Sequence, residues 1–174
     1  KMRCVTTCVD ELDAHGYTHH IQRLVVLGNW ALLTGVDPQA MTEWMWASFV
    51  DGAEWVMLPN VLGMALHADS GMMATKPYAA GGASIDRMSD YCKSCRFDRT
   101  KRVGPDACPF TTLYWDFLAR HETLLANNQR MTMQIRNLSR KAAFEMLVTE
   151  DAELPGEIAD RKSNSREENR GVRS

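Results

Sequence analysis

The sequence predicts an all-α fold, and three observations favour it. Apolar residues recur at three- and four-residue spacing over long stretches, which is the period of an α-helix. No stretch alternates apolar and polar residues as a half-buried strand would, and no internal repeat is present. The 174 residues, 45% of them hydrophobic, suffice for one compact domain and are hard to divide into two.

The first helix is expected over residues 9–34, where apolar positions recur at helical spacing. Gly35 directly follows the last apolar turn and is a typical helix stop. Asp37 and Pro38 then predict the start of a second helix, because aspartate is a preferred N-cap and proline is favoured in the first helical position. This second helix should run to about residue 50.

Later segments are shorter. Prolines and glycines predict loops with short helical pieces over residues 58–84, and Pro59 is expected to interrupt the helical segment that precedes it. A last clear helix is expected to begin at a threonine cap, Thr111 or Thr112, and to end near Leu125.

Residues 1–138 are predicted to form the folded part of the chain, and residues 139–174 a divergent, disordered tail. From residue 150 onward the chain is almost entirely polar and charged, so it cannot bury enough apolar surface to offset its ordering entropy. The chain starts with Lys1, which indicates a fragment or a processed product. No secretion signal is apparent, and no apolar run approaches the roughly 20 residues that a membrane span needs.

The cysteines are the most informative residues. Cys92 and Cys95 can bind one metal from a single turn, and Cys108, which directly precedes a proline, has the usual ending of a cluster-binding run. The segment between them is expected to be a loop organised by the metal. The fourth ligand would be Cys4 or Cys8, which leaves one of the five cysteines spare. Zinc and an iron–sulfur cluster both accept four thiolates, so the spacing leaves the metal open.

Charge does not point to nucleic acid for the chain as a whole, because the formal net charge is −2. Basic residues are nevertheless in excess in the loop between Cys95 and Cys108. That loop is either a solvated surface segment or an edge that contacts phosphates beside the metal site.

Two adjacent histidines, His19 and His20, lie within the first expected helix. A lone helical histidine is more often structural, but a pair followed by Arg23 favours proton exchange near neutral pH. Arg23 shares a helix face with His19 and could meet a carboxylate or a cofactor anion. Asp51 is its possible partner, or else an acid at a helix end in water. Most of the five tryptophans are expected in the core, and one or two could relay electrons near a redox cofactor.

Several stretches resemble known proteins. The segment YTHHIQRL at residues 17–24 and the segment EWVMLPNVLGM at residues 54–64 resemble the photolyase/cryptochrome superfamily, the first of them its active-site helix. The resemblance narrows to the iron–sulfur bacterial cryptochromes and photolyases, the prokaryotic (6-4) photolyase group, at four further stretches: ATKPY (74–78), RMSDYC (87–92), ACPF (107–110) and LYWDFL (113–118). The similarity covers residues 1 to about 138.

This resemblance implies a fold and a set of cofactors. The fold would be the C-terminal part of the helical FAD-binding catalytic domain, with long loops around the cluster. The cluster would be [4Fe–4S], with Cys8 as the spare thiol and four ligands: Cys4, Cys92, Cys95 and Cys108. An antenna chromophore of the ribityllumazine type would belong to an N-terminal domain that this sequence lacks.

The resemblance also implies roles for single residues. Arg23 and Asp51 would form an ion pair beside the flavin ring, and Trp44 would relay electrons that reduce the flavin. His19 and His20 would be the active-site histidines, one of them the proton donor to the lesion. Tyr17 and His20 would line the flavin and lesion side of the pocket, and Tyr78 would lie near the lesion.

The implied activity is that of a DNA photolyase, a carbon–carbon lyase. Excited, reduced FAD would pass an electron to a pyrimidine (6-4) photoproduct flipped out of UV-damaged DNA. We expect a monomer without a membrane partner, in the bacterial cytoplasm and associated with the nucleoid. Two alternatives stay open: a blue-light photoreceptor cryptochrome that does not repair, and a non-enzymatic metal-binding nucleic-acid module.

Overall fold

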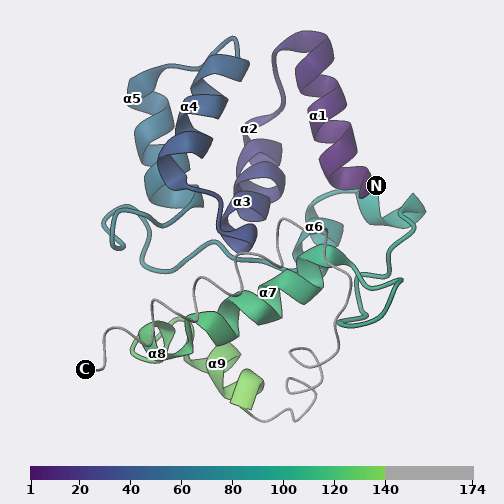
Figure 1. Cartoon of the computed structure of the whole chain (residues 1–174), viewed down its shortest axis with the longest axis vertical. Helices are drawn as coiled ribbons and strands as arrows, with labels where there is room; N and C mark the ends of the chain where they lie inside the picture. The colour runs from purple at the N-terminus through teal and green to yellow at the C-terminus, as the bar shows by residue number, and fades with distance from the viewer. Residues whose placement is uncertain (140–174) are drawn as a thin grey trace.

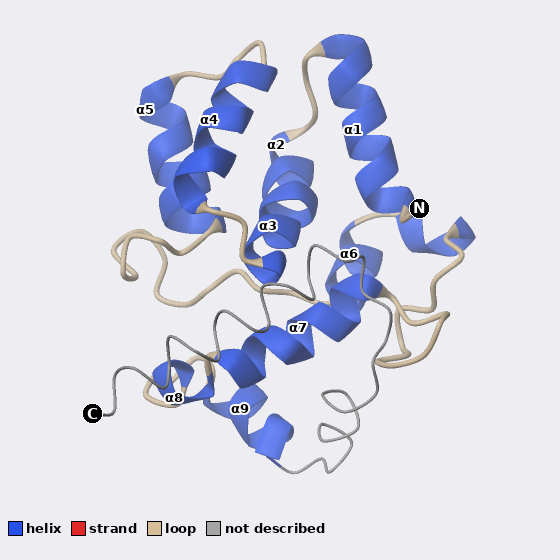
Figure 2. Ribbon diagram, viewed as in Figure 1, coloured by secondary structure: helices blue, strands red, loops and turns tan. Residues whose placement is uncertain are grey.

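The structure is a computed structural model that describes residues 1–139. Over these residues it is helical, with one isolated bridge between Asp98 and Ala107 as its only β-type pairing (Figure 2). The predicted all-α fold class is confirmed. No helix in the described part of the chain is long and apolar enough to cross a membrane. The expected tail, apart from Ser139, lies outside the described residues.

The helices form two groups (Figure 1). The first group is α1 (Arg3–His15), a continuous run of α2 (His20–Gln22), π-helical η1 (Arg23–Gly28) and α3 (Asn29–Thr34), then α4 (Pro38–Ser48), and α5 (Glu54–Met57) continuing into π-helical η2 (Leu58–Ala65). The second group is α6 (Gly82–Met88), the 3₁₀ turn η3 (Tyr91–Ser94), α7 (Pro109–Arg120), α8 (Glu122–Leu125) and α9 (Thr132–Ser139).

The run from α2 to α3 lies at the centre of the first group, with α1 on one side and the α4–α5 pair on the other (Figure 1). Helix α7 crosses beneath it and packs on α3, α6 and α9. The start of α1 also contacts η3, which brings the two ends of the expected metal site together. The core between these elements includes Leu33, Met45, Phe110 and Leu118, all fully buried.

The expected single helix over residues 9–34 is wrong at its start. Helix α1 ends at His15, and Gly16 caps it in the left-handed conformation with φ of 62°. Only glycine adopts this conformation without strain, so the glycine ends the helix although the apolar pattern continues. The carbonyl of Gly16 then accepts a hydrogen bond from Val50 N at 2.9 Å, which ties this turn to the end of α4.

The predicted start of α4 is confirmed. The Asp37 carboxylate accepts a hydrogen bond from the backbone N–H of Ala40 at 2.8 Å, and Pro38 occupies the first position of the helix. The predicted stop at Gly35 is confirmed as well, because this residue caps α3 with φ of 72°.

Pro59 does not interrupt the helix, contrary to expectation. It lies inside the run from α5 into η2, where the backbone changes from α-helical to π-helical bonding at Leu58. Proline has no N–H to donate, and the wider π turn accommodates the missing bond instead of ending the helix. The π segments η1 and η2 pack on each other, and Gly28 permits the contact, since a Cβ there would lie 2.8 Å from the Cβ of Ala65.

The threonine cap expected for the last clear helix is also wrong. Helix α7 begins three residues earlier than Thr112, with Cys108 as N-cap and Pro109 in the first position. Proline is favoured there because its fixed φ suits the first helical turn. His121 separates α7 from α8, so the helix expected to end near Leu125 is two short helices.

Three of the tryptophans lie on the surface, which contradicts the expectation that most are in the core. Trp44, Trp46 and Trp55 are 41%, 47% and 79% exposed. All three belong to α4 and α5, so the outer face of this helix pair is aromatic and open in the described part of the chain.

Replacing Gly16 by alanine tests the break between α1 and α2. Gly16→Ala should lower the free energy of unfolding by about 2–5 kcal/mol, because the left-handed conformation disfavours a Cβ and the new atom would crowd a neighbour. That Cβ would lie 2.6 Å from Cγ1 of Val50. Gly35→Ala is the matched control, since its φ is also positive but nothing lies within 4 Å of its Cβ. It should cost only about 1–2 kcal/mol. Equal losses in urea unfolding would contradict the tight contact at Gly16.

Candidate functional site

Four of the five cysteines line a single cavity. Cys4 comes from the first turn of α1 and Cys92 from η3, while Cys95 follows η3 and Cys108 caps the start of α7. Cys8, one turn beyond Cys4, does not line it. The other side chains in the wall are mainly apolar and include Met2, Ile85, Tyr91 and Phe97.

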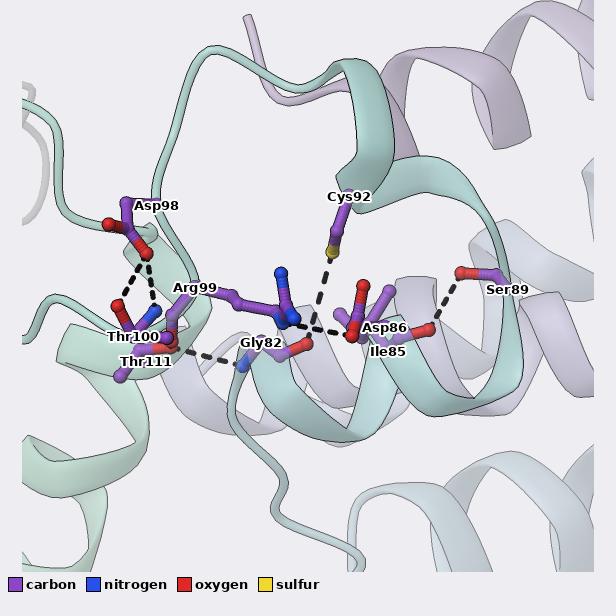
Figure 3. A network of polar contacts seen from close by, with 9 residues as sticks. All are labelled: Gly82, Ile85, Asp86, Ser89, Cys92, Asp98, Arg99, Thr100 and Thr111. Atoms are coloured by element: carbon purple, nitrogen blue, oxygen red, sulfur yellow. Dashed lines mark hydrogen bonds and ion pairs between the residues drawn. The ribbon is translucent and has the colours of Figure 1, made fainter.

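The loop between Cys95 and Cys108 is held closed by its own backbone. Asp98 N donates to the carbonyl of Asp106 at 2.7 Å, and the Asp98 carbonyl accepts from Cys108 N at 3.1 Å. The Asp98 carboxylate accepts hydrogen bonds from the hydroxyl and the N–H of Thr100 (Figure 3), and these bonds lower its pKa. The loop expected between these cysteines is therefore present, and its closure places Cys108 at the end of the cavity.

The backbone of α6 forms another wall of the cavity at Gly82. The Sγ of Cys92 lies 4.0 Å from the Gly82 carbonyl, and Gly82 N donates to the Thr111 hydroxyl at 3.1 Å (Figure 3). That hydroxyl in turn donates to the carbonyl of Arg99 at 3.0 Å. A Cβ at Gly82 would lie 2.9 Å from the Sγ of Cys108, so a side chain there would push against the thiol.

Burial controls the protonation of the thiols. Burial is the main cause that raises the pKa of Cys4 to about 12, and the charges of the other three lining cysteines act in the same direction. Burial also raises the pKa of Cys8 to about 11, where the hydrogen bond from Tyr91 acts in the opposite direction and Glu11 adds to the rise. The pKa of Cys4 thus depends on the other lining cysteines, whereas that of Cys8 depends on Tyr91 and Glu11.

Four thiolates can hold either a single metal ion or a cluster that carries its own sulfides. In the described residues, no three His, Cys, Asp or Glu side chains lie close enough together to hold one metal ion. A zinc ion needs all its thiolates about 2.3 Å from one point. A cluster carries its own bridging sulfides and so takes thiolates that stand further apart around a shared space. Four thiols around one cavity, with a glycine backbone against two of them, fit that donor set.

The histidine pair lies at the start of a helix and not within one, which corrects the expected position. His19 is the N-cap of α2, and its Nδ1 accepts a hydrogen bond from Ile21 N at 3.2 Å. The backbone N–H of His19 donates to the side-chain oxygen of Gln22 at 2.8 Å, which completes a capping box. His20 is the first residue of the helix, and both histidines are exposed.

The ion pair expected between Arg23 and Asp51 is present. Two guanidinium nitrogens contact the two carboxylate oxygens at 2.8 and 3.0 Å, and the Arg23 side chain is only 7% exposed. The third nitrogen, Nε, donates to the carbonyl of Thr18 at 2.8 Å. The guanidinium lies over the ring of Phe49 at 4.1 Å and over that of Tyr17 at 4.8 Å. Such a bidentate, stacked contact requires arginine, because lysine offers neither the planar fork nor the stacking surface.

Aromatic side chains lie near this ion pair. Trp44 contacts Phe49 edge to face, with ring centroids 6.3 Å apart, and remains 41% exposed. Tyr17 is 45% exposed, and the carboxylate side of the pair, Asp51, is 50% exposed. Half-exposed aromatic rings beside a fixed charge pair can receive a flat, polar ring system, which would stack on the aromatics and bond to the charges.

Tyr78 lies apart from these contacts, in the loop between η2 and α6, where it is 53% exposed. None of the hydrogen bonds or ring contacts found in residues 1–139 joins it to the histidines. Asn29 holds this loop. Its buried side-chain amide donates to the Ala80 carbonyl at 2.8 Å and accepts from Ala80 N at 3.1 Å. Sequence reasoning missed Asn29, although a polar amide after the apolar run 24–28 was a visible signal.

Comparison with known proteins identifies the family. The chain is 49% identical over 139 residues to a (6-4) photolyase of Agrobacterium fabrum, a match that covers 80% of this chain. The chain belongs to the photolyase/cryptochrome family. It spans about a quarter of that photolyase, since the match covers 27% of the relative's length. The all-α structure agrees with the C-terminal domain of photolyases.

A second relative is more distant. The chain is 29% identical over 94 residues to an uncharacterized protein, R855, of Acanthamoeba polyphaga mimivirus. This match covers 54% of the present chain and 69% of the viral protein. No model of a protein family matches the chain.

Removing the Asn29 amide should loosen the loop that carries Tyr78 in this photolyase-family chain. Asn29→Ala leaves the N–H and the carbonyl of Ala80 without partners, and we expect a loss of about 1–3 kcal/mol in the free energy of unfolding. Amide exchange at Ala80 should also accelerate. Asn60→Ala is the control, because within residues 1–139 that amide bonds to the Val56 carbonyl of its own helix and not to a distant loop. An Ala80 amide that still exchanges slowly in Asn29→Ala would show that the Asn29 side chain does not hold the loop.

Proposed function

We propose that the chain supplies the C-terminal part of the catalytic domain of a light-driven DNA-repair enzyme that reverses pyrimidine (6-4) photoproducts in UV-damaged DNA. The 49% identity to a (6-4) photolyase carries this proposal. The proposed reaction uses reduced FAD as electron donor, and residues 1–138 would form the flavin- and cluster-binding portion. The site geometry supports the assignment at two places, the four-cysteine cavity and the Arg23–Asp51 pair.

The proposed cluster is [4Fe–4S], bound by four thiolates: Cys4, Cys92, Cys95 and Cys108. The common cavity supports this proposal, because all four thiols line one space. These ligands join α1 to η3 and to the start of α7, which are far apart in sequence. The proposed role of the cluster is therefore structural, since the cluster would connect the start of the chain to the loop beside α7.

The proposed flavin site is the open side of the Arg23–Asp51 pair. When bound, reduced FAD supplies the light-excited electron for the reaction. Asp51 and Arg23 would orient the flavin ring, Tyr17 and His20 would border it, and Trp44 would give electrons a path from the surface. The stacking of Arg23 on Tyr17 and Phe49 supports this, because it restrains the guanidinium while the Asp51 side chain stays 50% exposed.

The two histidines are given different tasks. Nδ1 of His19 accepts the hydrogen bond that caps α2, so this nitrogen is engaged in holding the helix start. The His20 imidazole takes no part in the cap and is exposed. We therefore assign the proton donor to His20 and the positioning of the helix start to His19.

The proposed partner is duplex DNA with the lesion flipped out toward His20 and Tyr78. A damaged base is easier to unstack than an intact one, which suits a site that needs close approach. Phosphate contacts would come from the basic loop between Cys95 and Cys108, where Arg96, Arg99 and Lys101 are exposed. Such a protein would act as a monomer at the bacterial nucleoid.

Exchanging single cysteines tests the ligand set. Cys4→Ser should lose most of the iron from protein prepared without oxygen, because one of four thiolates is removed. Cys8→Ser should keep its iron, since Cys8 does not line the cavity. The iron and sulfide content of both variants is measured and compared with that of the wild type. Equal iron content in Cys4→Ser and the wild type would sink the assignment.

Exchanging the histidines tests their separate tasks in the full-length protein. His20→Ala should retain flavin but slow repair of (6-4) photoproducts by about 10²–10⁴-fold, the usual contribution of a general acid. His19→Asn should have a much smaller effect, because asparagine is also a good N-cap. Repair is followed by chromatography of the lesion under illumination. A larger loss in His19→Asn than in His20→Ala would reverse the assignment.

A further inference from the structure

The side-chain amide of Gln22 joins three parts of the molecule. Its oxygen accepts from the backbone N–H of His19 at 2.8 Å. Its nitrogen donates to the Tyr91 hydroxyl at 2.5 Å and to the Glu11 carboxylate at 3.0 Å. An amide is the one uncharged side chain that can accept at one end and donate twice at the other. Gln22 is half-buried, so these bonds are partly shielded from water.

One end of this connection lies at the four-cysteine cavity. Tyr91 lines the cavity and directly precedes Cys92 in η3. The Tyr91 hydroxyl also lowers the pKa of the Cys8 thiol, against the larger effect of burial, so the two side chains are neighbours. A movement of η3 would thus move the hydroxyl to which Gln22 donates.

The other end lies at the histidine pair. The bond from His19 N to Gln22 is half of the capping box that starts α2, and His20 is the next residue. A capping box satisfies two backbone N–H groups at the helix start that would otherwise lack partners. The position of the Gln22 amide therefore sets where the helix begins and how His20 is presented.

We propose that Gln22 is a positioning residue that couples the four-cysteine site to the active-site histidines. The route runs from η3 through the Tyr91 hydroxyl to the Gln22 amide and on to the N–H of His19. Filling the cavity fixes η3, and Gln22 transmits that order to the helix start. This rests on the proposed function, in which the cavity holds a cluster and the histidines act on the lesion.

Leucine at position 22 would remove the acceptor and both donors at similar size. A merely structural Gln22 would make Gln22→Leu less stable, but perturbations at Tyr91 would not reach His19. A coupling residue makes the response of His19 to Tyr91 depend on Gln22 itself. A double-mutant cycle with Tyr91 therefore distinguishes a structural from a coupling role of Gln22, whereas the Gln22→Leu variant alone does not.

The experiment measures the exchange rate of the His19 amide hydrogen by NMR in protein prepared without oxygen. Tyr91→Phe, and separately removal of the cluster by a chelator, should each raise this rate in the wild-type background. We expect an increase of at least about twofold, the smallest coupling that members of one hydrogen-bond network usually show. In Gln22→Leu the rate should already be high, and neither perturbation should raise it further. Gln39→Leu is the control, because that exposed amide bonds only to Glu43 in its own helix.

Two results would overturn the coupling: an unchanged His19 rate in Tyr91→Phe with wild-type Gln22, or the same increase with leucine at position 22. Gln22→Met serves as a second variant if the Gln22→Leu protein does not fold. Tyr91→Phe in the wild-type background tests the coupling without any change at Gln22. Iron analysis of the wild-type protein reports separately on the proposed function. Protein without iron would refute the cluster, while the response to Tyr91→Phe would still test Gln22.

Discussion

The buried guanidinium of Arg23 is the constraint on which the site depends. A buried charge is strongly unfavourable unless its donors are paired, and here they are paired with segments on either side of the helix. The Thr18 carbonyl lies just before α2, and Asp51 lies beyond the end of α4. Satisfying Arg23 therefore brings the histidine-bearing turn against the α4–α5 connection, and the bond from Val50 N to Gly16 holds the same junction. The presentation of the histidines follows from this packing.

The four-cysteine cavity is a second anchor, formed by residues of α1, α6, η3 and the start of α7. It joins α1 to the segment between α6 and α7, where Gly82 allows the α6 backbone to approach the thiols. Between the two anchors lies Gln22, which bonds to α1 through Glu11 and to η3 through Tyr91. In the proposed photolyase, a site that holds metal and a site that handles a lesion thus share one short stretch of chain. This would explain why a cluster without an assigned redox role could still matter to repair.

Local chemistry and the long-range Arg23–Asp51 pair could be predicted from the sequence, whereas most of the other long-range geometry could not. The cap at Asp37 and the cysteine spacing were readable because each depends on neighbours within a turn or two. The break at Gly16 was missed because an apolar pattern continued through it, and helical continuity at Pro59 depends on a π turn that no local rule indicates. The role of Asn29 depends on a loop 51 positions away, so its signal was only that of an amide in an apolar run.

The most direct test of the account is a visible absorption spectrum, with iron and sulfide analysis, of the protein purified without oxygen. The account predicts a brown protein whose broad absorption bleaches on reduction, with about four irons and matching sulfide per chain. A colourless protein that contains zinc would contradict it. The chain would then be a helical metal-binding module of the photolyase/cryptochrome family, and the cavity would hold a single ion after rearrangement of its thiols.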